Sequence, residues 1–89
     1  MNISGILVVV PSNRLASSIA SLNALPGVSV HHTDPSTGRI IVTQEAETTS
    51  AEIDGLQQIK ALPDVVLAEL VYHYFEHETP ESAIEPKEG

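Results

Sequence analysis

The four histidines are the residues of this chain best suited to metal or acid–base chemistry. His31 and His32 are adjacent in a segment that alternates like a strand, so we expect them to point to opposite faces of a sheet. His73 and His77 have the i, i+4 spacing of a helix, but they fall at a strand end and in the tail that follows. Because the chain has no cysteine, a metal site would need histidine and carboxylate ligands together. We therefore expect ordinary polar roles for these histidines, with no metal and no cofactor.

Catalytic motifs are missing from the sequence as well. It contains no glycine-rich phosphate loop, no nucleophile elbow and no pair of carboxylates flanked by apolar residues. Without cysteine there are no thiol nucleophiles and no disulfides. Ser12, Ser17, Ser18 and Ser21 fall in a predicted helix, where capping and surface roles explain them. These observations predict a protein that is not an enzyme.

The charge balance favours a cationic partner. The chain has 89 residues, enough for one domain, and a formal net charge of −8 with four basic residues. Nucleic-acid binding needs basic clusters that neutralise phosphates, so we expect no nucleic-acid partner. The apolar run 6–10 is too short for a signal peptide and lacks a basic lead-in, and no run approaches the length of a membrane span. A cytoplasmic location fits the lack of cysteine.

Two similar turns divide the chain into two strand–helix–strand halves. Residues 24–28 read Ala-Leu-Pro-Gly-Val and residues 61–65 read Ala-Leu-Pro-Asp-Val, each after a helical pattern and before a strand pattern. From residue 77 the chain is acidic and contains Pro80 and Pro86, so we expect a folded domain over 1–76 and a disordered tail over 77–89. Strands are expected over 3–10, 28–33, 39–44 and within 62–76, and helices over 12–24 and 49–62.

Local signals predict how the two helices begin and pack. Ser12 is a candidate N-cap for the first helix, and Thr49 with Glu52 has the spacing of a capping box for the second. Ile53 is expected on the inner face of the second helix. Gly55 lowers helix propensity, which suggests a place where this helix approaches another element closely.

The order β-α-β-β-α-β predicts an α+β, ferredoxin-like fold, with two helices on one face of a four-stranded antiparallel sheet. The other face is then open, and an uncovered sheet face with apolar residues indicates a binding surface. Strand alternation turns Val28, Val30, His32, Ile40, Val42, Val66, Ala68, Leu70 and Tyr72 toward the helices. It places Ser29, His31, Thr33, Arg39, Ile41, Thr43, Leu67, Glu69, Val71 and His73 on the open face. The first strand is a near-continuous apolar run, so its two faces are not distinguished.

Four glutamates, Glu45, Glu69, Glu76 and Glu78, fall near the ends of two strands. They form either a solvated acidic rim or a docking rim for arginines and lysines, because a carboxylate binds a guanidinium group through two hydrogen bonds.

Three stretches of the chain resemble the NapD family, the small cytoplasmic chaperones of periplasmic nitrate reductase. They are residues 22–28 (Leu-Asn-Ala-Leu-Pro-Gly-Val), 37–42 with 45–47, and Leu-Val-Tyr-His at 70–73 with Glu76 close behind. The similarity spans residues 5–76, although the family's usual glycine at the entry to the last strand is Asp64 here.

The resemblance implies binding of the twin-arginine signal peptide at the N-terminus of the nitrate reductase catalytic subunit. Binding would restrain export until the molybdenum cofactor has been inserted. Ile41, Leu67 and Val71 would receive the apolar flank of a helical peptide, as in helix-in-groove recognition. Polar contacts would come from the open-face residues His31, Arg39, Glu69 and His73.

A small-molecule-sensing module of the ACT or Lrp type is the alternative, because it shares the βαββαβ order. Such modules bind amino acids at dimer interfaces and are usually joined to another domain. We expect a monomer instead, and a monomeric state would disfavour this alternative.

Overall fold

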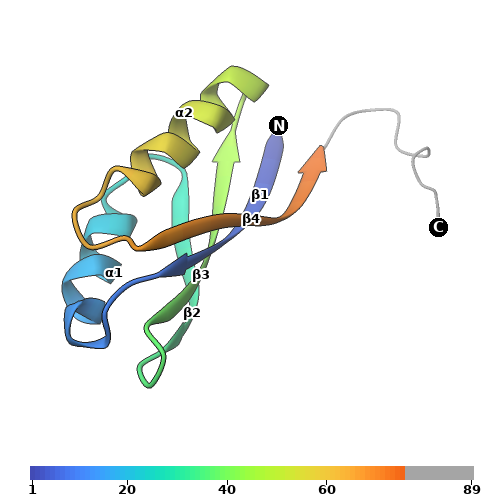
Figure 1. The fold of residues 1–89 in the computed structure, drawn as a ribbon. Coiled ribbons are helices and arrows are strands. Elements are labelled where there is room, and N and C mark those ends of the chain that lie inside the picture. The colour runs from blue at the N-terminus through green and yellow to red at the C-terminus, as the bar shows by residue number, and fades with distance from the viewer. Residues whose placement is uncertain (76–89) are drawn as a thin grey trace, which may run out of the picture.

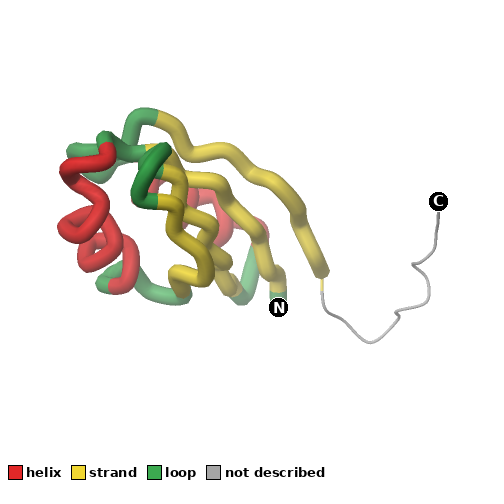
Figure 2. Tube along the Cα trace, turned by 90° about the horizontal axis from the view of Figure 1, so that it is seen from below, coloured by secondary structure: helices red, strands yellow, loops and turns green. Residues whose placement is uncertain are grey.

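The computed structural model describes residues 1–75 as a sheet with two helices packed on one side. Figure 1 and Figure 2 show that no helix covers the other side of the sheet in this part of the chain. The predicted ferredoxin-like α+β fold is confirmed, whereas the predicted tail over 77–89 lies outside the described residues. The elements are β1 (Asn2–Val9), a 3-10 turn η1 (Ser12–Arg14), α1 (Leu15–Asn23), β2 (Val28–Asp34), β3 (Arg39–Ala46), α2 (Thr49–Lys60) and β4 (Leu67–Phe75).

The strand order is β2-β3-β1-β4, and all neighbouring strands are antiparallel. The two central strands pair without interruption, from Asn2 opposite Ala46 to Val9 opposite Arg39. Each edge strand instead contains a β-bulge. His31 is the extra residue of β2 and Val71 that of β4. A bulge shifts the alternation of every residue beyond it, so these two positions decide which side chains reach each face.

The core lies between the sheet and the two helices. Side chains from both central strands and both helices are fully buried there, and each full burial of an isoleucine or leucine is worth about 2 kcal/mol. The buried hydrophobic residues are Ile6, Val8, Val10, Leu22, Val28, Ile40, Val42, Ile59 and Ala68. The residues of β1 that point to the helices are therefore the even-numbered ones.

The first helix begins differently from the sequence prediction. Ser12 lies inside η1 rather than at an N-cap, and α1 starts at Leu15 without a side-chain cap. Arg14 at the end of η1 donates through Nε to Asp64 at 3.3 Å, in the loop that leads to β4. The fixed φ of Pro11 and the turn bond from the Arg14 N–H to the Pro11 carbonyl start the helical path instead.

The second helix is capped one residue earlier than predicted. Thr48 is the N-cap, and its hydroxyl accepts from the Ala51 N–H at 3.0 Å. The predicted capping box is wrong, because Glu52 is buried under the helix rather than turned back to its start. Ile53 is correspondingly exposed, at 53%, instead of lying on the inner face.

Gly55 lies on the inner face of α2, where the helix crosses β3. A Cβ at this position would lie 2.6 Å from the side-chain amide of Gln44. That amide is buried and donates to the Glu52 carbonyl at 2.9 Å. The close approach predicted from Gly55 is therefore confirmed, and Gln44 is the residue that requires it.

Candidate functional site

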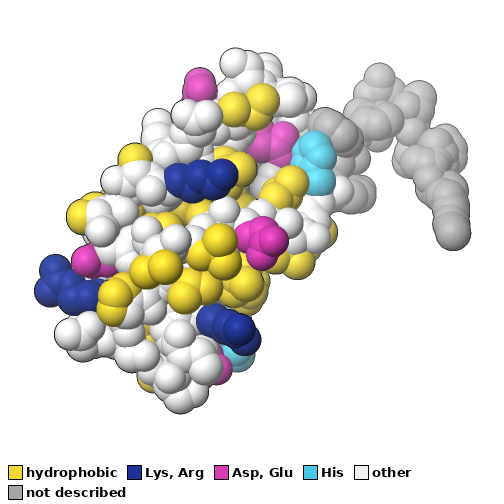
Figure 3. Space-filling view, in the orientation of Figure 1, with side chains coloured by type: hydrophobic (Ala, Val, Ile, Leu, Met, Phe, Trp, Pro, Cys, Tyr) yellow, Lys and Arg dark blue, Asp and Glu magenta, His cyan; other side chains and the backbone are white. Residues whose placement is uncertain are grey.

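The open face of the sheet is the candidate binding surface. It combines half-buried apolar residues of the central strands with exposed apolar residues of the edge strand β4. Figure 3 shows hydrophobic side chains gathered where β1 and β4 run, with charged groups among them. An apolar area of this kind, rimmed by polar groups, is typical of an interaction surface.

Seven of the ten predicted site residues lie on the open face. They are neighbours of buried core residues in their strands and therefore point the opposite way. His31 Nε2 lies 2.8 Å from Thr43 Oγ1, which links β2 to β3 across this face. The seven are Ser29, His31, Arg39, Ile41, Thr43, Leu67 and Glu69.

Thr33 is not on the open face. The bulge at His31 shifts the end of β2, so that Thr33 pairs with the buried Ile40 on the helix side. The same shift places His32 opposite Ile41, exposed on the open face. The prediction that the adjacent histidines point to opposite faces is therefore wrong, because strand alternation does not hold across a bulge.

The bulge at Val71 likewise exchanges two residues of β4. His73 pairs with the buried Ser4 and points to the helix side, where its Nε2 lies 2.9 Å from Glu52 Oε1. Tyr72 pairs with Gly5 and lies on the open face, against the prediction that it faces the helices. Val71, the extra residue itself, is 60% exposed at the sheet edge.

The Tyr72 ring occupies the space that a side chain at position 5 would need. Gly5 is buried in the structure although it carries no side chain, because the ring covers it. An aromatic ring across a strand glycine is a known way to close a gap in a sheet surface. The sequence signal for this contact was the single glycine in a strand that is apolar over most of its length.

Sequence reasoning also missed the residues that the central strand β1 contributes. Ile3, Leu7 and Val9 are partly buried and lie on the open face, because the even-numbered residues face the core. Leu7 pairs with Ile41 on one side and Glu69 on the other, so it lies in the middle of the surface. A run that is apolar on both faces, as residues 6–10 are, gives no alternation from which these faces could be distinguished.

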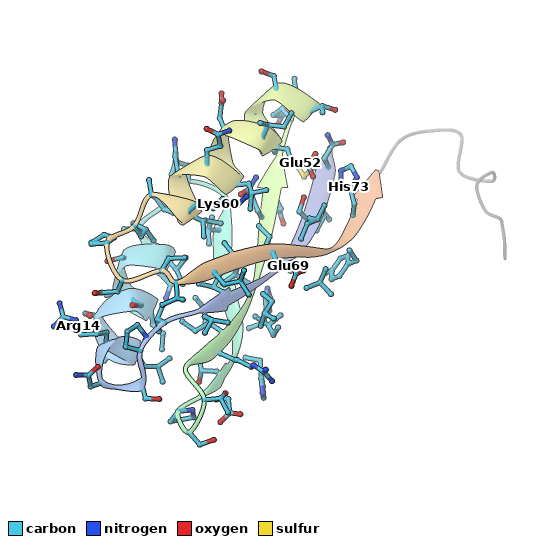
Figure 4. All side chains as sticks on the ribbon, in the orientation of Figure 1. Arg14, Glu52, Lys60, Glu69 and His73 are labelled. Carbon is cyan, nitrogen blue, oxygen red and sulfur yellow. The ribbon has the colours of Figure 1, made fainter. Side chains whose placement is uncertain are left out.

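The charges of the open face are separated along the strands. Glu45 and Arg39 lie six residues apart on β3, about 20 Å at the rise of an antiparallel strand. Glu69 is opposite Leu7, near the middle of β4, as Figure 4 shows. Glu76 and Glu78 of the predicted rim lie outside the described residues. One end of the surface therefore carries Glu45, and the opposite end carries Arg39 with Asp34 opposite it on β2.

Within residues 1–75, no three histidine or acidic side chains gather closely enough to hold a metal ion. In the same range, no helix is both long enough and apolar enough to cross a membrane.

Comparison with known proteins gives consistent matches over nearly the whole chain. The family model described as "NapD protein" matches residues 1–77. The chain is 30% identical over 80 residues to chaperone NapD of Escherichia coli K12, covering 90% of this chain and 92% of that protein. Chaperone NapD of Shigella flexneri matches at the same identity and coverage.

Two solved structures have a similar fold. The solution structure of the E. coli Tat proofreading chaperone protein NapD matches with a TM-score of 0.76 and 27% identity, over 94% of this chain and 87% of that one. A transcriptional regulatory protein of the AsnC family from Pyrococcus furiosus matches with a TM-score of 0.67 and 19% identity, over 90% of this chain and 55% of that one. The second likeness concerns the fold alone.

Proposed function

The chain belongs to the NapD family, and on that premise we propose that it is a chaperone of twin-arginine signal peptides. Its partner in this proposal is the signal peptide of the periplasmic nitrate reductase catalytic subunit. Binding in the cytoplasm holds back export until the molybdenum cofactor is in place. The chain acts as a monomer and has no enzymatic step of its own.

The observation that carries the proposal is the combination of apolar and acidic groups on the open face. A signal peptide has a basic segment followed by an apolar one and can form a helix, so it needs both kinds of contact. Leu7, Val9 and Leu67 offer a continuous apolar surface across two strands. Removal of this area from water supplies most of the affinity, at about 25 cal/mol per Å².

The separated charges indicate how the peptide lies. The arginines are attracted to Glu45 and Glu69, whereas Arg39 at the other end of β3 repels them, and Asp34 opposite Arg39 offsets part of that repulsion. At that other end Arg39 pairs with Val9, which pairs with Leu67, so apolar surface is available beside it. We propose that the apolar part of the peptide covers this end, with the twin arginines toward Glu45.

Calorimetric titration tests the proposal directly. A synthetic twin-arginine signal peptide is compared with a twin-lysine version and with a scrambled peptide of equal charge. We expect binding that is lost on scrambling and weakened with lysine, because lysine lacks the planar fork that fits a carboxylate. Absence of binding up to about 1 mM, equivalent to about −4 kcal/mol, contradicts the proposal.

Site variants locate the peptide on the chain. Leu67→Ala and Tyr72→Ala remove exposed apolar surface from the open face, and we expect each to weaken binding about tenfold. Val66→Ala is the matched control, since Val66 is equally apolar and 73% exposed but precedes the paired strand. An equal loss of peptide affinity in all three variants would mean that the peptide binds by nonspecific hydrophobic contact and not at this face.

A further inference from the structure

A second candidate site lies on the helix-covered side of the sheet, away from the proposed peptide surface. There a cavity of about 210 Å³ separates α2 from the edge strand β4. Its walls are aliphatic side chains of Ile6, Leu56 and Leu70, and one end carries the Glu52 carboxylate and the His73 ring. Figure 4 shows Glu52 on α2 and His73 on β4 pointing toward each other. The volume is smaller than the 300–1,000 Å³ of drug-sized pockets, so it suits one side chain or a small molecule.

The cavity is lined by a buried ionisable side chain, Glu52, which is unusual in a protein core. Glu52 is 8% exposed and accepts hydrogen bonds from Ser4 Oγ and, at 3.4 Å, from Asn2 Nδ2. Its one cationic partner within residues 1–75 is His73, with Nε2 at 2.7 Å from Glu52 Oε2. When the imidazole is neutral, no described residue that lines the cavity supplies a positive charge to the Glu52 carboxylate. A buried charge without a counter-charge is costly, so a cation that reaches it is favoured.

The shape of the cavity selects among cations. Ile53 and Leu70 at its mouth are 53% and 47% exposed, so a ligand must pass and pack against aliphatic surface. A compact ammonium ion is strongly hydrated and has no apolar part to pack there. An alkylguanidinium has an aliphatic stem, a weakly hydrated planar head and donors that match a carboxylate.

We propose that the cavity between α2 and β4 binds an alkylguanidinium group. The stem packs against Leu56, Ile53 and Leu70, and the head donates to Glu52. The group can come from a free guanidino compound or from an arginine side chain of a bound peptide, because β4 is an edge strand beside which a peptide can pass. For the second source, the site adds an arginine anchor to the proposed function.

Titration with butylguanidinium, followed by methyl NMR of the full chain, tests the proposal. We expect shifts at Ile53 and Leu70, with Leu67 and Ile41 on the open face unchanged. Neutral butylurea, which has a similar shape, is expected to bind at least tenfold more weakly. Equal shifts with both compounds, shifts confined to the open face, or no shifts up to tens of millimolar would overturn the proposal.

Two variants and a control separate charge recognition from folding. Glu52→Gln keeps a hydrogen-bonding group but removes the charge, and we expect at least a tenfold loss of butylguanidinium affinity. Ile53→Lys changes an exposed rim position and brings a competing cation to the mouth, so it abolishes binding without touching the core. Asp54→Asn makes the same charge change as Glu52→Gln at an exposed position of the same helix and leaves affinity unchanged. Equal affinity in the wild type, Glu52→Gln and Ile53→Lys would also overturn the proposal.

The signal peptide then identifies the source of the group. If the peptide displaces butylguanidinium, and a twin-lysine peptide does not, an arginine of the peptide is the natural occupant. If the peptide shifts only open-face residues while butylguanidinium still binds, the occupant is a free compound. Peptide shifts at Leu67 and Ile41 report the proposed chaperone function independently, so the two hypotheses can fail separately.

Discussion

The two edge strands of the sheet each contain one extra residue, but their bulges are held in different ways. The bulge at His31 in β2 is linked to the rest of the sheet by the side-chain contact from His31 to Thr43 on the open face. The bulge at Val71 in β4 is held from both faces. His73 contacts Glu52 on the helix side, and Tyr72 covers Gly5 on the open face.

This difference shows how a bulge can serve as a connection between the two faces of a sheet. In β4, the consecutive residues Tyr72 and His73 point to opposite faces. Tyr72 packs over Gly5 on the open face, and His73 contacts Glu52 on the helix side. A change in the buried carboxylate is therefore expected to reach the open face through two neighbouring residues of one strand. In β2 both histidines lie on the same face, so no comparable link to the core exists among the described contacts.

Loss of the buried carboxylate is expected to have the largest effect. Glu52→Ala removes the contact with His73 and the acceptor of the two buried donors, Ser4 and Asn2, which costs about 3 kcal/mol of unfolding free energy. Urea denaturation measures the cost, and hydrogen exchange should show lost protection at residues 71–73 before residues 28–34. Asp54→Ala on the exposed side is the control. Equal losses in the two variants would mean that the network does not hold β4.

Crowding of the aromatic contact is expected to have the next largest effect. Gly5→Val places a side chain where the Tyr72 ring lies, and we expect a loss of about 2 kcal/mol from displacement of the ring. The double variant Gly5→Val with Tyr72→Ala removes the clash and should recover part of this loss in a double-mutant cycle. Strictly additive losses in thermal denaturation would show that the two residues do not interact.

The bulge in β2 is expected to tolerate substitution better. Thr43→Val removes the oxygen that contacts His31, and because this hydrogen bond is exposed we expect a loss of about 0.5 kcal/mol. Denaturation is measured beside Ser29→Ala, a change at an exposed position of the same face. A loss as large as that of Glu52→Ala would contradict the distinction between the two edges.

The smallest effect concerns the turn that follows β2. Hydrogen bonds from the Ser36 hydroxyl and backbone N–H lower the pKa of Asp34 below its ordinary value. A carboxyl whose pKa is lower in the folded state stabilises the fold above the unfolded-state pKa of about 3.9, and this contribution is lost as the pH falls through the folded value. In an NMR titration, Ser36→Ala should raise the pKa of Asp34 toward the ordinary value. No change would assign the effect to the remaining causes, which are the Ser36 backbone N–H, the Thr37 side chain and the charge of His32.

The sequence was most informative where strands pair without interruption. The alternation of Ile40 and Val42 with Arg39, Ile41 and Thr43 in β3 matches the structure, because a central strand with a regular register keeps its period. It failed for Thr33, Tyr72 and His73, because a bulge depends on contacts across strands and has no strong local signature.

The prediction for Glu52, in a helix, failed for a similar reason. Three residues after Thr49, it had the local spacing of a capping box, but Ser4, 48 residues earlier, provides its actual partner. Tertiary contacts of this kind override local propensity, and they also explain why the cavity was not predicted.

The contact between Gln44 and Gly55 has a consequence for the evolution of the chain. The two residues share one space, so a larger residue at position 55 requires the Gln44 amide to move away or a shorter residue at position 44. Among relatives that keep the crossing of α2 over β3, these positions are expected to covary. A lineage that gains helix propensity with alanine at position 55 must displace the amide from its present position, and with it the bond to the Glu52 carbonyl. At this single pair of residues, a gain in helix propensity is thus accompanied by the loss of a hydrogen bond that anchors α2 on the sheet.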